Sequence, residues 1–156
     1  MEWKPFISSP DNLINYRILG FRRVISLVTT ASLNTIFILL IVFQVKHFLA
    51  DFPLQFPYML RKFSPNWDFV FPLSLHCAVH ASFTLLICLY YAPALWWLAV
   101  VDFIAHFVID RIKSGPRYLG RFADIKTMSY WTVFGLDQMA HHLTHIYFVW
   151  VILKYI

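Results

Sequence analysis

The sequence contains few charged residues. Asp, Glu, Lys and Arg make up 13% of its 156 residues, whereas a soluble domain of this length carries roughly a quarter. Hydrophobic residues make up 60%. A small globule cannot hide that many apolar side chains from water, so the excess is expected to face lipid. The composition therefore predicts an integral membrane protein that forms one compact bundle.

Cysteine is also scarce, and the sequence lacks a cleavable signal peptide. Cys77 and Cys88 are the only cysteines and share one apolar stretch. On one helix they would lie about 16 Å apart, too far for a disulfide. The first apolar run follows more than twenty residues, and no small-residue cleavage site comes after it. We therefore expect the first helix to remain in the mature protein.

Four apolar stretches, at about residues 30–50, 70–91, 93–112 and 130–152, each approach the length that crosses hydrocarbon. The first should end or kink near Asp51, because Pro53 disfavours helix at Phe52. Ala92 and Pro93 predict a very short turn between the second and third stretches. We therefore expect an all-α integral membrane protein with a four-helix transmembrane domain over residues 30–156.

Residues 1–29 form a separate N-terminal segment in this interpretation. A polar lead is followed from Asn12 by a helical pattern, with an apolar stripe of Ile14, Ile18, Phe21 and Ile25. Arginines lie off that stripe, which is typical of an amphipathic helix in the membrane interface. The same pattern also fits the water-exposed end of the first span, and the two interpretations carry equal weight.

The histidines and half of the acidic residues follow the expected up-and-down topology. We call the side of the membrane on which the first span ends the B side. The polar residues fall in the second half of the first and third spans, in the first half of the second, and near the middle of the fourth. Because alternate spans run in opposite directions, this alternation predicts that all of them lie between the midplane and the B side.

Within each span these residues recur three or four positions apart, so they share a helix face. The four stripes are Gln44, His47, Asp51 and Gln55; His76, His80 and Thr84; Asp102, His106 and Asp110; and Asp137, His141, Thr144 and His145. An ionisable group that faces lipid costs several kcal/mol, so each stripe should point into the bundle. His142 lies off its stripe, and we expect it to make a hydrogen bond between helices.

Imidazoles and carboxylates together predict a metal site. The candidate ligands are His47, Asp51, His76, His80, His106, Asp110, His141 and His145. Asp102 and Asp137 are candidate general bases. The cofactor would be a divalent metal, with zinc favoured and iron or manganese as alternatives. The number of candidates suits two ions, or one ion with further carboxylates that orient the histidines. A proton pathway is disfavoured, because the polar groups occupy only half of the membrane depth.

The segments KHFLADFPLQ, LHCAVHASF, VDFIAHFVIDRIK and LDQMAHHLTH resemble the domain-of-unknown-function 3307 family of bacterial and phage inner-membrane proteins. This resemblance implies a multi-pass protein of the bacterial inner membrane. The H-x-x-x-D spacing of His47/Asp51 and His106/Asp110 is also similar to motifs of membrane-bound metal-dependent hydrolases, and of zinc-dependent phospholipase C and related nucleases. That similarity implies hydrolysis of a phosphoester.

We therefore expect a membrane metal-dependent hydrolase that acts on a lipid or a lipid-linked or other phosphoryl substrate. The basic loop over residues 113–127 would attract phosphate, although Lys and Arg also simply mark cytoplasmic loops. Membrane lipid is the expected partner, and nucleic acid is not expected. One alternative is a non-catalytic subunit of a larger membrane complex or homo-oligomer with a structural metal or polar network. The other is a di-iron oxidase or desaturase-like enzyme, since HCAVH and HHLTH are similar to histidine boxes.

Overall fold

The computed structural model describes the backbone of residues 10–156 and the side chains of residues 32–156, together with Arg22 and Arg23. Four α-helices account for most of it: α1 (Pro10–Asp51), α2 (Val70–Tyr91), α3 (Trp97–Ser114) and α4 (Met128–Tyr155). Short 3₁₀ turns join them: η1 (Pro57–Phe63), η2 (Trp67–Phe69), η3 (Pro93–Leu95) and η4 (Leu119–Phe122). Residues 10–156 contain no strand, which confirms the all-α prediction.

The chain divides into two compact units, residues 1–38 and 39–156. In the first unit, helix α1 runs from Pro10 without a break through the boundary expected at residues 29 and 30. Residues 1–9 of the expected polar lead lie outside the described residues, as do the side chains of the apolar stripe. The choice between an interfacial helix and the end of the first span therefore stays open.

Three helical segments have the length and composition to cross a membrane: Ser32–Asp51, Trp67–Tyr91 and Pro93–Ser114. Helix α1 ends at Asp51 and α2 covers Val70–Tyr91, as the sequence predicts. Helix α3 begins later than expected because Pro93–Leu95 forms a 3₁₀ turn, and it continues two residues further, to Ser114. Helix α4 is not among these three segments, so the fourth span stays a prediction.

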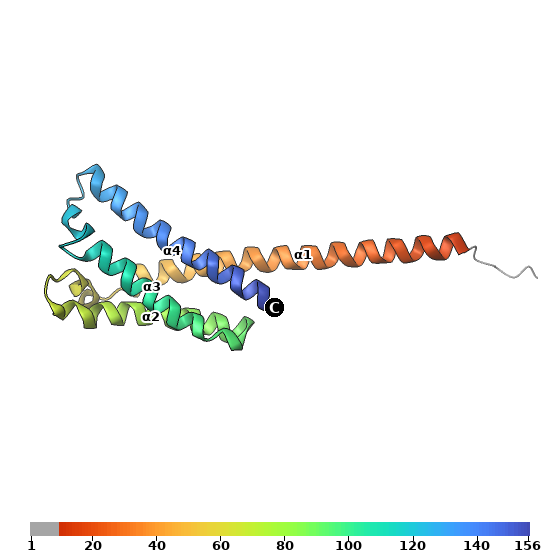
Figure 1. The fold of residues 1–156 in the computed structure, drawn as a ribbon, viewed down its shortest axis with the longest axis horizontal. Coiled ribbons are helices and arrows are strands. Elements are labelled where there is room, and N and C mark those ends of the chain that lie inside the picture. Colours follow the sequence, from red (N-terminus) through yellow and green to blue (C-terminus); the bar gives the residue numbers. More distant parts are fainter. Residues whose placement is uncertain (1–9) are drawn as a thin grey trace, which may run out of the picture. The chain divides into compact units, whose positions relative to one another are not determined.

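In the second unit, α2 and α3 run side by side in opposite directions, and α4 packs along α3 (Figure 1). The C-terminal end of α1, the start of α2, the end of α3 and the start of α4 all lie at the end that carries the longer loops (Figure 1). This end corresponds to the B side. Arg111 and Ser114 fasten η1 across it, with bonds of 3.1 Å to the Ser64 carbonyl and 3.2 Å to the Lys62 carbonyl.

The interior of the second unit is apolar at the end opposite the B side. Leu39, Phe43, Leu98, Phe148 and Ile152 pack there with no exposed surface. Cys77 and Cys88 are buried and free. Towards the B side the interior changes character, and polar residues replace the apolar ones.

Candidate metal centre

The four predicted polar stripes meet inside the second unit. His76, His80, Asp102 and His106 have no exposed surface, and His47, Asp110, Asp137, His141 and His145 are nearly as buried, whereas Asp51 is partly exposed. Imidazole rings from all four helices approach one another, with ring centroids 3.9 Å apart for His80 and His106 and 4.3 Å for His106 and His141. Convergence of the stripes at one depth is therefore confirmed.

Asp51, at the end of α1, is surrounded by three imidazoles. Its Oδ1 lies 3.1 Å from His80 Nε2 and 3.4 Å from His76 Nε2, and its Oδ2 lies 3.2 Å from His47 Nε2. Among the described residues, no Lys or Arg pairs with this carboxylate. Asp51 is also the most accessible of the four acids, with 18% of its side chain exposed.

Asp110, near the end of α3, bridges two histidines and a lysine. Its Oδ2 lies 3.2 Å from His76 Nε2, and its Oδ1 lies 3.3 Å from His141 Nε2. Lys62 donates to Oδ2 over 2.9 Å. Lys62 reaches this interior position because η1 folds across the B-side end of the bundle.

Asp137, on α4, pairs with a lysine from the end of α3. Lys113 Nζ donates to its Oδ2 over 2.8 Å, and the side-chain amide of Gln138 donates to the same oxygen over 3.1 Å. The other oxygen, Oδ1, lies 3.5 Å from His141 Nε2 and makes no hydrogen bond. This geometry leaves Oδ1 free to accept a proton.

Asp102, in the middle of α3, lies deeper and away from any opening. Lys46 Nζ donates to its Oδ2 over 2.6 Å, and Thr84 Oγ1 donates to the same atom over 2.7 Å. Its Oδ1 lies 3.1 Å from His106 Nδ1. The predicted catalytic Asp102 is thus held behind His106, where it orients that ring.

His106 presents a bare nitrogen to the centre of the cluster. Its Nδ1 lies 3.0 Å from the Asp102 backbone carbonyl, and a carbonyl only accepts hydrogen bonds, so Nδ1 carries the proton. In a neutral ring, Nε2 then bears a lone pair. Nε2 is buried and has no hydrogen-bond partner, which is the arrangement that a metal ligand requires.

Three further residues of α4 differ in how they relate to the cluster. Lys46 Nζ lies 3.2 Å from His145 Nε2, so that nitrogen of His145 is engaged by a cation. Thr144 bonds to its own helix at the Ala140 carbonyl and does not join the cluster. His142 is half-buried, with its ring edge-on to His47 at 5.6 Å.

Sequence reasoning missed the buried lysines. Lys46 and Lys62 are 2% and 5% exposed and neutralise Asp102 and Asp110. For Lys46 a signal existed, because a lysine inside an apolar span is costly and normally has a partner. Lys62 carried no such signal, since it lies in a loop segment of the sequence. Lysines therefore compensate Asp102, Asp110 and Asp137 without a metal ion.

One contact of the cluster, between Asp51 and His76, has the spacing expected of two ligands of the same metal ion. Two atoms that bind one zinc ion at about 2.1 Å and the tetrahedral angle stand about 3.4 Å apart. Asp51 Oδ1 and His76 Nε2 are separated by 3.4 Å, and His76 Nε2 has no hydrogen-bond partner. Asp51, His76 and His80 each offer a ligand atom within 4.8 Å of the other two, as do His47, His80 and His106.

A third group of this kind consists of Asp110, Asp137 and His141. Lysines already pair with both of its carboxylates. Counting Asp51 and Asp102 as well, four carboxylates face three ammonium groups, which leaves one uncompensated negative charge. One divalent ion would bring the net charge of this set from −1 to +1, whereas two would bring it to +3, a larger buried excess of positive charge.

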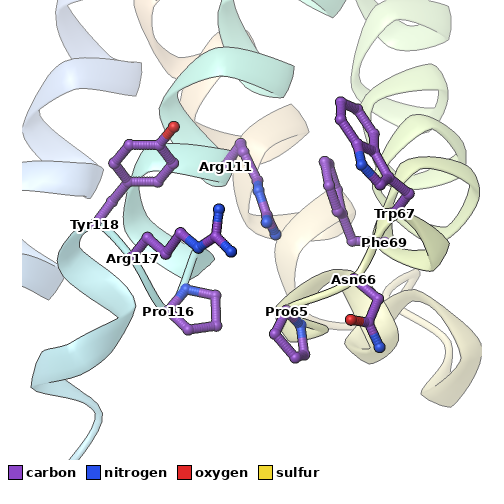
Figure 2. A pocket seen from close by; sticks show the side chains of 8 residues that line it. All are labelled: Pro65, Asn66, Trp67, Phe69, Arg111, Pro116, Arg117 and Tyr118. Atoms are coloured by element: carbon purple, nitrogen blue, oxygen red, sulfur yellow. The ribbon is translucent and has the colours of Figure 1, made fainter.

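A pocket of about 110 Å³ opens at the B side onto this cluster. Asp51 and Asp110 lie in its wall together with Lys62 and Lys113, and the remaining lining includes Phe134 and two glutamines. A second pocket, of about 250 Å³, lies between the α2 and α3 ends (Figure 2). There the Arg111 guanidinium carbon lies 3.5 Å from the centre of the Phe69 ring. The Arg117 side chain points towards Arg111 (Figure 2).

A family model described as "Protein of unknown function (DUF3307)" matches residues 36–156. No curated protein and no solved structure shows significant similarity to the chain. The matched range includes every residue of the cluster.

Proposed function

Because the chain belongs to the DUF3307 family, whose description names no activity, we propose from the geometry that it is an integral-membrane metal-dependent hydrolase. It binds a divalent ion, with zinc favoured, at the B-side half of a four-span bundle in the bacterial inner membrane. The substrate is a lipid or a phosphoryl compound.

The environment of Asp51 carries this proposal. It is the one acid of the cluster that has no lysine partner among the described residues, and two imidazole nitrogens approach its Oδ1 at 3.1 and 3.4 Å. It also lines the B-side pocket. A cation held by Asp51, His76 and His80 would neutralise this carboxylate where substrate can arrive. His47 and His106 stand beside it as further ligands.

Each remaining residue has a role in this account. A bound divalent ion supplies a Lewis acid and lowers the pKa of its water. Asp137 Oδ1, which makes no hydrogen bond, would accept the proton that the attacking water loses, and this proton would then go to the leaving oxygen of the substrate. His141 lies between Asp137 and Asp110 and would orient both carboxylates. Lys62 and Lys113 at the pocket attract phosphate oxygens. Asp102 acts through His106 as a positioning residue.

Hydrolysis of a phosphoester by purified protein tests the proposal. We expect detergent-purified protein to release phosphate from a lipid phosphate ester, to lose this activity with a chelator, and to regain it with zinc. Changing His76 to Ala should abolish the activity, whereas the Lys154→Met change, at an exposed position at the far end of α4, should not. An active protein that is indifferent to chelation would contradict the metal mechanism. A protein inactive with every metal and phosphoester would contradict the hydrolase.

One set of observations favours a second candidate, a non-catalytic subunit of a membrane complex. Lys46, Lys62 and Lys113 neutralise three of the acids at 2.6–2.9 Å without any ion, as a purely structural polar network would. Such a subunit would co-purify with partner chains and show no turnover. A di-iron centre, the third candidate, would reveal itself by visible absorption of the purified protein.

A further inference from the structure

A groove on the membrane-facing surface between α3 and α4 leads to the candidate centre. It has a volume of about 180 Å³. Ile109 and Ile112 of α3 line it on one side, and Leu136 and Ala140 of α4 on the other. Ile112 and Leu136 are about half exposed, and α3 belongs to a segment that can cross a membrane. The outer part of the groove therefore faces hydrocarbon.

The inner end of this groove is charged. Lys113 and Asp137, which form the ion pair beside His141, also line the groove. Lys113 also lines the B-side pocket and a smaller pocket of about 60 Å³ between them. One ammonium group thus stands where a path from the lipid joins a path from the B side.

Lys113 has hydrogen-bonding capacity left for a ligand. An ammonium group carries three N–H donors, and Asp137 Oδ2 takes one of them. Its side chain is 24% exposed, unlike the more deeply buried Lys62. An apolar groove that ends at a partly free ammonium group is complementary to a molecule with an alkyl chain and an anionic head.

We propose that a membrane phospholipid enters the site sideways from the bilayer, with an acyl chain in the α3–α4 groove and its phosphate at Lys113. This deepens the proposed function, on which it rests, by naming the substrate class and its route. The B-side pocket then serves for entry of water and release of the soluble product.

Photolabelling in nanodiscs tests this route without any need for turnover. One probe is a phosphatidylglycerol with a diazirine on an acyl chain, and the other is a diacylglycerol with the same chain and no phosphate. We expect the phosphatidylglycerol probe to label residues 133–140 about five-fold more than the diacylglycerol, as one lysine near the membrane surface provides. Lys113→Gln should bring the two probes to equal labelling.

Matched variants separate the groove from the general lipid surface. Ala140→Phe fills the groove and should abolish the excess, while Leu143→Phe, at an exposed position of the same helix, should leave it. Equal labelling of the parent protein by both probes would overturn the proposal, and this comparison requires no variant to fold. Suppression by inorganic phosphate would show that the site takes free phosphate and would overturn lipid entry.

The photolabelling result can be read separately from the test for hydrolysis. Headgroup-dependent labelling in a protein without bound metal would refute the reaction and keep the lipid site. Metal-dependent hydrolysis without headgroup-dependent labelling would support the reaction and refute the lipid site.

Discussion

The two halves of the helical bundle bury different kinds of side chain, although the same helices form both. Away from the B side, Phe43, Leu98, Phe148 and Ile152 fill the interior with apolar side chains. Towards the B side, the same helices bury histidines, aspartates and lysines to a comparable degree. The apolar half gains stability from packing, whereas the polar half must compensate every buried charge.

Stability alone does not explain the buried charges of the polar half, since hydrophobic replacement of a buried ion pair is often neutral or stabilising. The buried lysines offset three of the carboxylates but leave Asp51 with imidazoles alone. This difference is the reason why we propose a cation at Asp51.

The largest effect should come from breaking one ion pair of the polar half. Lys46→Met leaves Asp102 as an uncompensated buried charge, and we expect a loss of about 3–5 kcal/mol in the free energy of unfolding. Unfolding in mixed detergent micelles measures it, with Lys126→Met as an exposed control. The double change Lys46→Met with Asp102→Leu should recover most of the loss. A single variant as stable as the parent protein would mean that Asp102 is not charged.

The same double variant should separate stability from metal affinity. Without Asp102, His106 loses the carboxylate that orients its ring, and such losses weaken metal binding about 10–100-fold. Zinc titration of the metal-free protein in detergent measures the change. Zinc affinity equal to that of the parent protein would show that His106 and Asp102 do not contribute to the metal site.

In the apolar half, a smaller and purely structural effect is expected. Ile152 is fully buried, and Ile152→Val should cost about 1 kcal/mol of stability. Zinc affinity should stay at the parent value, because no candidate ligand changes. Reduced affinity in this variant would show that the two halves are coupled.

Topology and spacing made much of this architecture predictable. Pro53 placed the end of the first span at Asp51, and alternating span directions placed the histidines of all four helices at one depth. Pairing within the cluster was not predictable, because it depends on how each helix is rotated about its axis. Lys46 lies next to His47 in the sequence yet pairs with Asp102, and Lys62 enters only through the fold of η1.

Metal content tests the central claim most directly. Protein purified in detergent without chelator, and its His76→Ala and Asp51→Asn variants, would be compared by elemental analysis. The account predicts one divalent transition-metal ion for each parent chain and far less than one in either variant. A folded parent chain that holds no ion even after incubation with zinc would contradict it, as would two tightly held ions in the presence of the three lysines.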